Sequence, residues 1–136
     1  PTDMARDFRR LAVLAAKAAS EKQAEDIVLY HIKPISGLAD YLLLATVDSP
    51  AQLEAVEDHV SRQLKDKSVS LIRRDGAHSA LWRVLDYGGL LVHLMHRDAR
   101  EFYSLDKLYI DARRVSWEEA PAKPARKAAP RARKRS

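Results

Sequence analysis

The segment LWRVLDYGGLLVHLM, residues 81–95, reads as two short apolar strands around two glycines. Two-residue turns of this kind join antiparallel strands into a β-hairpin. Side chains alternate between the two faces of a strand, so this hairpin has one almost wholly apolar face, which we expect to pack on helices. The opposite face mixes apolar side chains with an acid and an imidazole, whose presence needs an explanation. That face carries Trp82, Val84, Asp86, Leu91, His93 and Met95.

A turn at the two glycines makes Asp86 and His93 diagonal neighbours, roughly 7–8 Å apart at the backbone. Such a pair could be a catalytic dyad, but Ser79 and Ser104, the nearest serines in sequence, lie outside any nucleophile motif. Two other interpretations stay open. The pair could form a hydrogen bond that orients the imidazole, or it could belong to a protein-binding surface with Trp82 as an apolar anchor.

The segments on either side of the hairpin predict a mixed α/β (α+β) domain. Residues 40–47, DYLLLATV, are nearly all apolar, as in a central strand that is buried on both faces. Ser49 can be the N-cap of a helix that has Pro50 at its first position and Gln52 in a capping box. The predicted order is helix, strand, strand, helix, three strands and a helix, with a sheet of about five strands. The other predicted segments are a helix over 3–23, strands over 27–32 and 68–73, and a C-terminal helix over 96–109 with Asp98 as its N-cap.

The positive charge of the chain is concentrated at its C-terminus. The net charge is +5, with 24 Lys and Arg against 19 Asp and Glu. Residues 121–136, PAKPARKAAPRARKRS, hold seven of the basic residues and no acid, so the rest of the chain is at about −2. We therefore predict a domain over residues 1–116 and a disordered basic tail over 117–136. The tail is either a solubilising end or a site of unspecific RNA contact. Its basic residues are Lys123, Arg126, Lys127, Arg131, Arg133, Lys134 and Arg135.

Several classes of site and location are disfavoured by composition. The sequence has no cysteine, which excludes disulfides, zinc-thiolate sites and thiol catalysis. His93 and His96 point to opposite faces of a strand, so we expect no metal site and no cofactor. No apolar run reaches the roughly 18 residues of a membrane span. The N-terminal segment PTDMARDFRR has no apolar core of a signal peptide, so a cytoplasmic location is expected.

The segment ISGLADYLLLA, residues 35–45, is similar to the start of a nucleotidyltransferase site. Phosphoryl chemistry on Mg²⁺ needs at least two carboxylates to hold the ions. Here Asp40 is followed two residues later by Leu42, so the second carboxylate is missing. If the fold is of that type, it therefore lacks the usual metal site.

Four segments together resemble the ribosomal silencing factor family, also called RsfS or Iojap. The resemblance covers about residues 5–112, and the basic tail lies outside this core. One departure is Gly89, where the family usually has an acid after the glycine of the turn. The segments, in order, are AEDIVLYHI (24–32), SGLADYLLLATVDSPAQLEAVEDHV (36–60), LWRVLDYGGLLVHLM (81–95) and REFYSLDKLYIDA (100–112).

The resemblance implies a mixed α/β domain with a nucleotidyltransferase-like fold but without its catalytic site, in a protein that is not an enzyme. It also implies binding to ribosomal protein L fourteen of the large ribosomal subunit. A protein bound there sterically blocks association with the small subunit and represses translation under nutrient limitation. A role in large-subunit assembly through the same surface is the alternative, and a degenerate nucleotidyltransferase is a more remote one. A mildly acidic domain suits a basic ribosomal partner, and an apolar sheet edge could pair two copies into a homodimer. The expected partner-binding residues are Trp82, Asp86, Tyr87, Gly88, His93 and Met95 in the hairpin, with Asp40 and Tyr41 nearby in the sheet.

Overall fold

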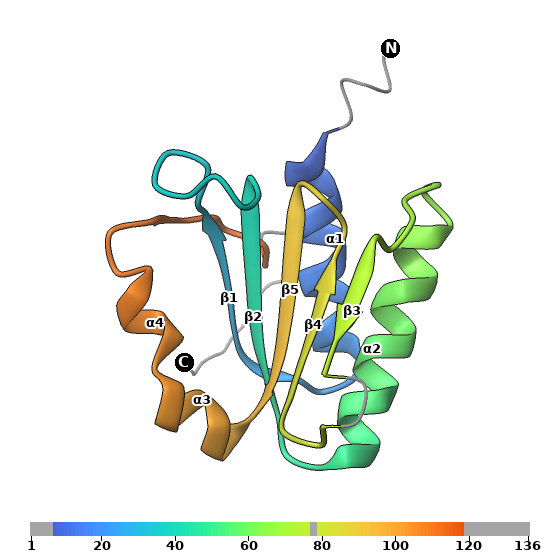
Figure 1. Cartoon of the computed structure of the whole chain (residues 1–136). Helices are drawn as coiled ribbons and strands as arrows, with labels where there is room; N and C mark the ends of the chain where they lie inside the picture. The colour runs from blue at the N-terminus through green and yellow to red at the C-terminus, as the bar shows by residue number, and fades with distance from the viewer. Residues whose placement is uncertain (1–6, 77–78, 119–136) are drawn as a thin grey trace, which may run out of the picture.

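The computed structural model describes residues 7–76 and 79–118 of the chain. Their centre is a six-stranded mixed sheet with the order β3-β4-β5-β2-β1-β6 (Figure 1). Strands β2 and β5 are parallel, and the other neighbours are antiparallel. The expected α/β fold with a mixed sheet is confirmed. The strands are β1 (Glu25–His31), β2 (Tyr41–Val47), β3 (Arg73–Asp75), β4 (Trp82–Asp86), β5 (Leu90–His96) and β6 (Arg113–Arg114).

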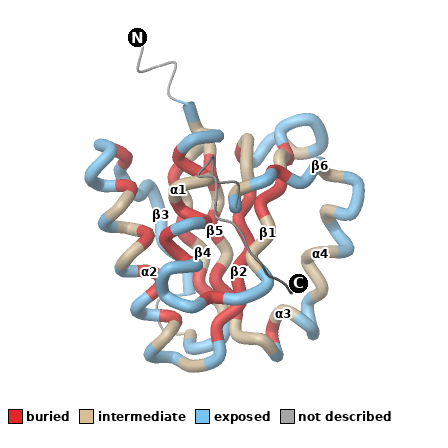
Figure 2. Tube along the Cα trace, turned by 180° about the vertical axis from the view of Figure 1, so that it is seen from behind, coloured by how far each residue is buried: buried red, intermediate tan, exposed pale blue. Residues whose placement is uncertain are grey.

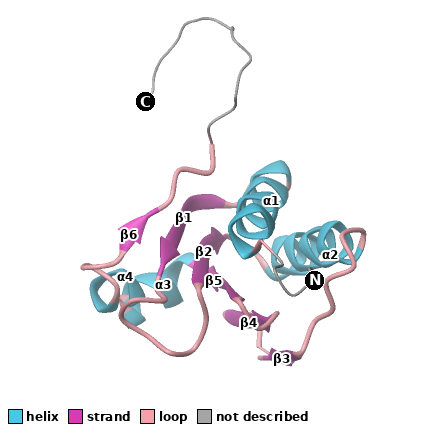
Figure 3. Ribbon diagram, turned by 90° about the horizontal axis from the view of Figure 1, so that it is seen from above, coloured by secondary structure: helices cyan, strands magenta, loops and turns pink. Residues whose placement is uncertain are grey.

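The helices lie on both faces of this sheet (Figure 3). Helices α1 (Phe8–Glu21) and α2 (Pro50–Lys65) lie side by side on one face. Helices α3 (Arg97–Tyr103) and α4 (Leu105–Leu108) lie on the other face, on the side of the sheet where β1 and β2 run. The strands β3, β4 and β5 therefore have one face without a long helix over it. Within the described part of the chain, no helix has the length and apolar character needed to cross a membrane.

The β4–β5 hairpin has the predicted register. Val84 faces His93, Trp82 faces Met95, and the amide of Tyr87 donates to the carbonyl of Leu90 at 2.9 Å. Gly88 has a φ of +91°, which glycine adopts without strain. The face predicted to pack on helices is buried against α1 and α2. Figure 2 shows the buried residues along the strands of the sheet. The side chains of the helix-packed face are Arg83, Leu85, Tyr87, Leu90, Val92 and Leu94.

The start of α2 also follows the sequence. The hydroxyl of Ser49 accepts a hydrogen bond from the amide of Gln52 at 3.1 Å, so Ser49 is the N-cap. The side chain of Gln52 accepts from the amide of Asp48 at 2.7 Å, one residue before the amide that a capping box uses. The second helix thus begins at Pro50, as predicted.

Three elements differ from the prediction. Strand β3 lies at Arg73–Asp75 and not at 68–73, because Val69 turns into the core and only the later residues pair with β4. The C-terminal helix begins at Arg97 with His96, not Asp98, as its N-cap. It ends at Ser104, whose φ of +48° breaks the helix before α4. The sixth strand, β6, pairs with the free edge of β1 and was not expected.

The face of the sheet under α1 and α2 carries one buried charged side chain. The side chain of Arg83 is 2% exposed and pairs with Glu57 of α2. Arg83 also donates to the carbonyls of Gly76 at 3.1 Å and Ser79 at 2.9 Å, and Arg74 of β3 binds the same carboxylate. Desolvation raises the pKa of Glu57, but the hydrogen bonds and charges of the two arginines together keep it below its ordinary value. This network therefore fastens β3 and the start of the β3–β4 loop to α2.

Candidate partner-binding surface

The hairpin face opposite α1 and α2 ends in a group of contacting aromatic rings. The indole Nε1 of Trp82 donates a hydrogen bond to Nδ1 of His93 at 3.0 Å. The ring of Tyr103, from α3, lies 4.7 Å from that of Trp82, centroid to centroid. Phe102 meets Tyr103 edge-on at 4.9 Å. We call Leu81, Trp82, His93, Phe102 and Tyr103 the aromatic surface.

Much of the aromatic surface is open to solvent. Phe102 is 79% exposed, Tyr103 53% and Leu81 52%, while Trp82 and His93 are half-buried beside them. Large apolar side chains that are exposed together mark binding sites, because water contact with them is unfavourable. Aromatic side chains are also the residue types most enriched in the energetic centres of protein interfaces. The geometry is therefore that of a docking surface.

The predicted hydrogen bond between Asp86 and His93 is wrong. Asp86 folds back on the turn and accepts from the amide of Gly88 at 2.8 Å. His93 instead accepts from Trp82, which lies diagonally across the ladder. Burial lowers the pKa of His93 to about 4, so the imidazole is neutral near pH 7. The two side chains serve separate purposes, one holding the turn and the other holding the tryptophan.

Two of the residues expected to bind a partner lie on the α1 side of the sheet, and a third, Met95, lies on the same face as Trp82 but is covered there by α3. Tyr87 is 4% exposed on the face toward α1 and α2, where burial raises the pKa of its hydroxyl. Met95 is fully buried among the residues that pack under α3. Tyr41 packs toward the α1 side of the sheet, with its ring 4.9 Å from that of His31. Tyr87 and Met95 therefore present almost no surface to a partner, and Tyr41 lies on the opposite face.

The remaining predicted residues lie near the turn end of the hairpin. The amide of Asp40 donates to the carbonyl of Gly89 at 3.0 Å, which brings Asp40 beside the turn. Asp86 and Gly88 lie in the same region, and all three residues are partly exposed. Trp82 is four residues from Asp86 along β4, about 13 Å at the usual rise of a strand. The structure thus separates the predicted patch into two groups, an acidic turn end and an aromatic end.

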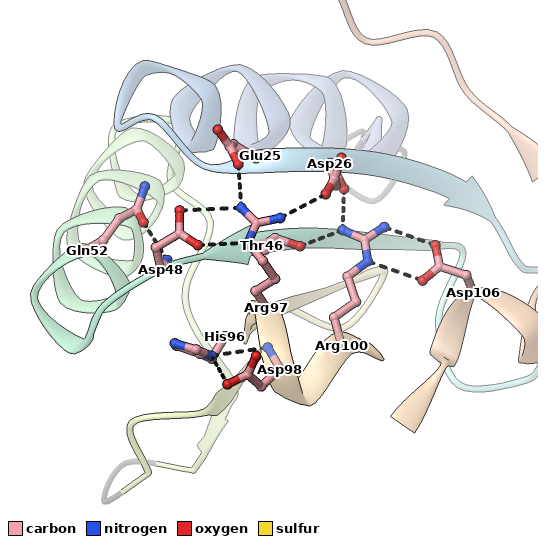
Figure 4. A network of polar contacts seen from close by, with 10 residues as sticks. All are labelled: Glu25, Asp26, Thr46, Asp48, Gln52, His96, Arg97, Asp98, Arg100 and Asp106. Carbon is pink, nitrogen blue, oxygen red and sulfur yellow. Dashed lines mark hydrogen bonds and ion pairs between the residues drawn. The ribbon is translucent and has the colours of Figure 1, made fainter. Parts of the chain in front are cut away.

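Phe102 and Tyr103 were missed by the sequence analysis. A weak signal for them exists, because consecutive side chains on a helix point about 100° apart, so two adjacent aromatic residues seldom lie at the centre of the same buried face. Their position depends on a polar network that fixes α3 (Figure 4). Arg100 donates to Thr46 of β2 at 2.9 Å and to Asp106 at 2.9 Å, and Arg97 donates to Asp48 at 2.9 Å. The two arginines hold the pKa values of Asp48 and Asp106 below the ordinary range.

This network borders a hollow of about 360 Å³ between α3 and the sheet. The side chains of Arg97 and Arg100 are committed there to Glu25, Asp26, Asp48 and Asp106. No three His, Cys, Asp or Glu side chains of the described residues are grouped to hold a metal ion. The arrangement joins elements of the fold, and its arginines are already bound to acids of the domain. The seven basic tail residues lie outside the described residues.

The chain is similar to proteins of known family. A family described as "Ribosomal silencing factor during starvation" matches residues 5–136, further than the resemblance over 5–112. Ribosomal silencing factor RsfS of Halalkalibacterium halodurans is 33% identical over 110 residues, which are 81% of this chain and 94% of that protein. The factor of the same name from Bacillus subtilis is 34% identical over 99 residues, 73% and 84% of the two chains. A crystal structure of a Chromobacterium violaceum protein superposes with a TM-score of 0.74 at 26% identity, covering 87% of this chain and 98% of that one.

Proposed function

This chain belongs to the ribosomal silencing factor family, and from that premise we propose that it silences translation by occupying the large ribosomal subunit. The proposed contact is ribosomal protein L fourteen, and the proposed effect is a steric block of association with the small subunit. Nutrient limitation is the condition under which we expect this repression to matter. We propose further that the chain acts by binding and not as an enzyme.

The single observation that carries the proposed contact is the exposure of the aromatic surface. Phe102 and Tyr103 together present two rings to solvent, and Trp82 supports them from the sheet. When aromatic side chains become buried in a protein interface, they supply most of its binding free energy, at about 2 kcal/mol or more each. We therefore place the centre of the contact at the aromatic end of the hairpin face.

The turn end of the same face supplies a second, electrostatic part of the proposed contact. Asp40 and Asp86 are partly exposed there, and the carboxylate of Asp86 has one oxygen bound to Gly88. A carboxylate that is already held in place can accept from a Lys or Arg of a basic partner with little further ordering. Charge complementarity of this type raises the association rate and fixes the orientation of the complex more than it raises affinity.

The mechanism requires only a rigid domain of sufficient bulk at the subunit interface. The helices α1 and α2 lie on the side of the sheet away from the aromatic surface (Figure 3). In the proposed complex they would project away from the bound protein, into the space that the small subunit needs. The basic tail is proposed to add unspecific contacts with ribosomal RNA, because counterion release favours such binding.

Binding to purified ribosomal subunits tests the proposal directly. The full chain is sedimented with large or small subunits, and joining of the subunits is then followed by light scattering. We expect the chain to pellet with the large subunit and to lower the scattering increase. Loss of both effects in Phe102→Ala, with both retained in the exposed control Ile110→Ala, would support the aromatic surface as the contact. A chain that ignores the large subunit, or that binds and leaves joining unchanged, contradicts the proposal.

Purified ribosomal particles also distinguish silencing from the alternative role in large-subunit assembly. An assembly factor prefers immature large subunits and leaves the joining of mature subunits unchanged, whereas a silencing factor binds the mature subunit and prevents joining. Competition between the two kinds of particle for a limiting amount of the chain measures this preference. Preference for immature particles without an effect on joining would favour the assembly role.

A further inference from the structure

A second hollow lies on α1, where this helix passes the C-terminal end of α2, on the side of the sheet away from the aromatic surface. Its volume is about 320 Å³. We call it the α1 groove, and its lining comes from α1 apart from one residue that follows α2. The lining residues are Arg10, Leu11, Val13, Leu14, Lys17 and Lys67.

The floor of the α1 groove is apolar. Leu11 is 8% exposed and faces the core, while Val13 and Leu14 are half-buried and pack only partly against it. Leu11 and Leu14 are three residues apart on one side of α1, and Val13 lies next to Leu14, so the three side chains form an apolar stripe. A stripe that is only partly covered leaves apolar surface for another apolar side chain to bury.

The rim of the α1 groove is positively charged and poorly neutralised. Among the described residues, the ammonium groups of Lys17 and Lys67 have no carboxylate partner. Arg10 pairs with Asp7 at 3.8 Å, and both of these side chains are largely exposed. By contrast, the arginines of the other networks are bound to acids of the domain itself, as Arg97 is to Asp48. The rim charge is therefore available to an external acidic group.

We propose that the α1 groove binds an acidic amphipathic segment of a second protein. Aliphatic side chains at helical spacing in that segment would cover Val13 and Leu14, and flanking Glu or Asp would pair with Lys17, Lys67 and Arg10. Charge complementarity excludes the chain's own basic tail as the occupant. An RNA strand fits less well, because none of the described residues that line the groove is aromatic and could stack on bases.

The position of the groove has a direct consequence for simultaneous binding. The groove lies on the face of the sheet that α1 and α2 cover. The aromatic surface lies on the opposite face, beside α3 (Figure 3). A segment in the groove would therefore leave the aromatic surface accessible. The domain would then connect two proteins, and this second partner does not depend on the identity of the first.

A labelled peptide tests the proposal with the full chain. The probe is a fluorescein-labelled helical peptide of 14 residues that carries leucines on one side and glutamates on the other. We expect saturable binding with a micromolar Kd, at least tenfold weaker for K17E/K67E. Both side chains are exposed, so circular dichroism should show an unchanged fold. A scrambled peptide of equal composition is expected to bind at least tenfold more weakly.

A matched charge reversal in the tail separates the groove from simple electrostatics. The variant K123E/K127E changes the net charge by the same amount and should keep the peptide affinity within about twofold. If it loses affinity as K17E/K67E does, or if the scrambled peptide binds equally well, the proposal is overturned. It is also overturned if K17E/K67E weakens binding of a labelled uridine dodecamer and leaves peptide binding unchanged, which would assign the groove to RNA.

Discussion

The indole of Trp82 donates its hydrogen bond to the Nδ1 atom of His93, across the ladder between β4 and β5. A ring nitrogen that accepts carries no proton, so this bond requires a neutral imidazole. Burial also favours the neutral imidazole, since it lowers the pKa of His93 to about 4. The bond and the burial together tie the aromatic surface to the protonation state of one histidine.

The first prediction concerns stability against pH. An unfolded histidine titrates near pH 6.5 and His93 near 4, so the unfolded state binds the extra proton first as the pH falls. Stability is complete above about pH 6.5 and decreases towards pH 4, by up to about 3 kcal/mol. Urea unfolding at several pH values measures this slope. His93→Gln should flatten it between pH 5 and 6.5. An equal slope in wild type and His93→Gln would contradict the prediction.

The second prediction concerns Gly89, the position at which the family usually has an acid. A Cβ atom built at Gly89 would lie 2.3–2.6 Å from three ring atoms of Phe8, so α1 packs where a side chain would be. Gly89→Asp should therefore cost about 1–3 kcal/mol of unfolding free energy. In the Phe8→Ala background the same change should cost much less. If the two changes have additive effects on the unfolding free energy, the contact with Phe8 does not restrict the side chain at position 89.

The third prediction concerns the buried charges of Glu57 and Arg83. Glu57→Ala leaves Arg83 without its main partner in a buried site, which should cost about 3–5 kcal/mol. Replacement of both residues, in Glu57→Leu with Arg83→Met, should restore at least half of that loss, because no charge is then left unpaired. Urea unfolding provides the measurement, and Asp58→Ala, at an exposed pair with Arg62, is the control. A double variant as unstable as Glu57→Ala would contradict this account.

The fourth prediction compares exposed apolar residues on different surfaces. Phe102→Ala should weaken binding to the large subunit by about 30-fold, or about 2 kcal/mol, while the unfolding free energy stays nearly constant. Ile110→Ala removes a side chain of similar exposure, 75% against 79%, outside the aromatic surface and should leave binding unchanged. Titration of labelled protein with large subunits measures both. Equal affinities for the two variants would move the contact elsewhere.

The fifth prediction concerns the basic tail. A chain that ends at Trp117 should still bind the large subunit, but its affinity should depend less steeply on salt. Each phosphate contact that is lost lowers the slope of log K against log salt by about 0.7–0.9. Sedimentation at several salt concentrations gives the slope for both chains. Identical slopes would mean that the tail makes no contact with RNA.

The parts of the fold that could be predicted have strong local signals. Alternating side chains and the two glycines define the β4–β5 hairpin, and the Ser49 cap defines the start of α2. Strand β6 has no such signal, because its two residues are exposed arginines. They form a strand only through their pairing with the free edge of β1. Strand β3 is likewise placed by tertiary contacts, since Arg74 binds Glu57 of α2.

The candidate site was predictable only in part. Alternation along β4 already places Tyr87 on the packing face with Leu85, and the structure confirms that placement. The burial of Met95 could not be foreseen, because it depends on where α3 crosses the sheet. The partners of Asp86 and His93 depend on side-chain rotamers that a register does not specify.

The bonds of Arg100 to Thr46 and Asp106 have a kinetic consequence for the aromatic surface. They attach α3 to the sheet before any partner arrives, so Phe102 and Tyr103 do not have to be ordered during the encounter. Much of the conformational entropy that association usually costs has then been spent in folding. Association with a partner surface that is also preformed should therefore proceed in one step, with a rate that rises linearly with concentration and shows no plateau from a slow rearrangement.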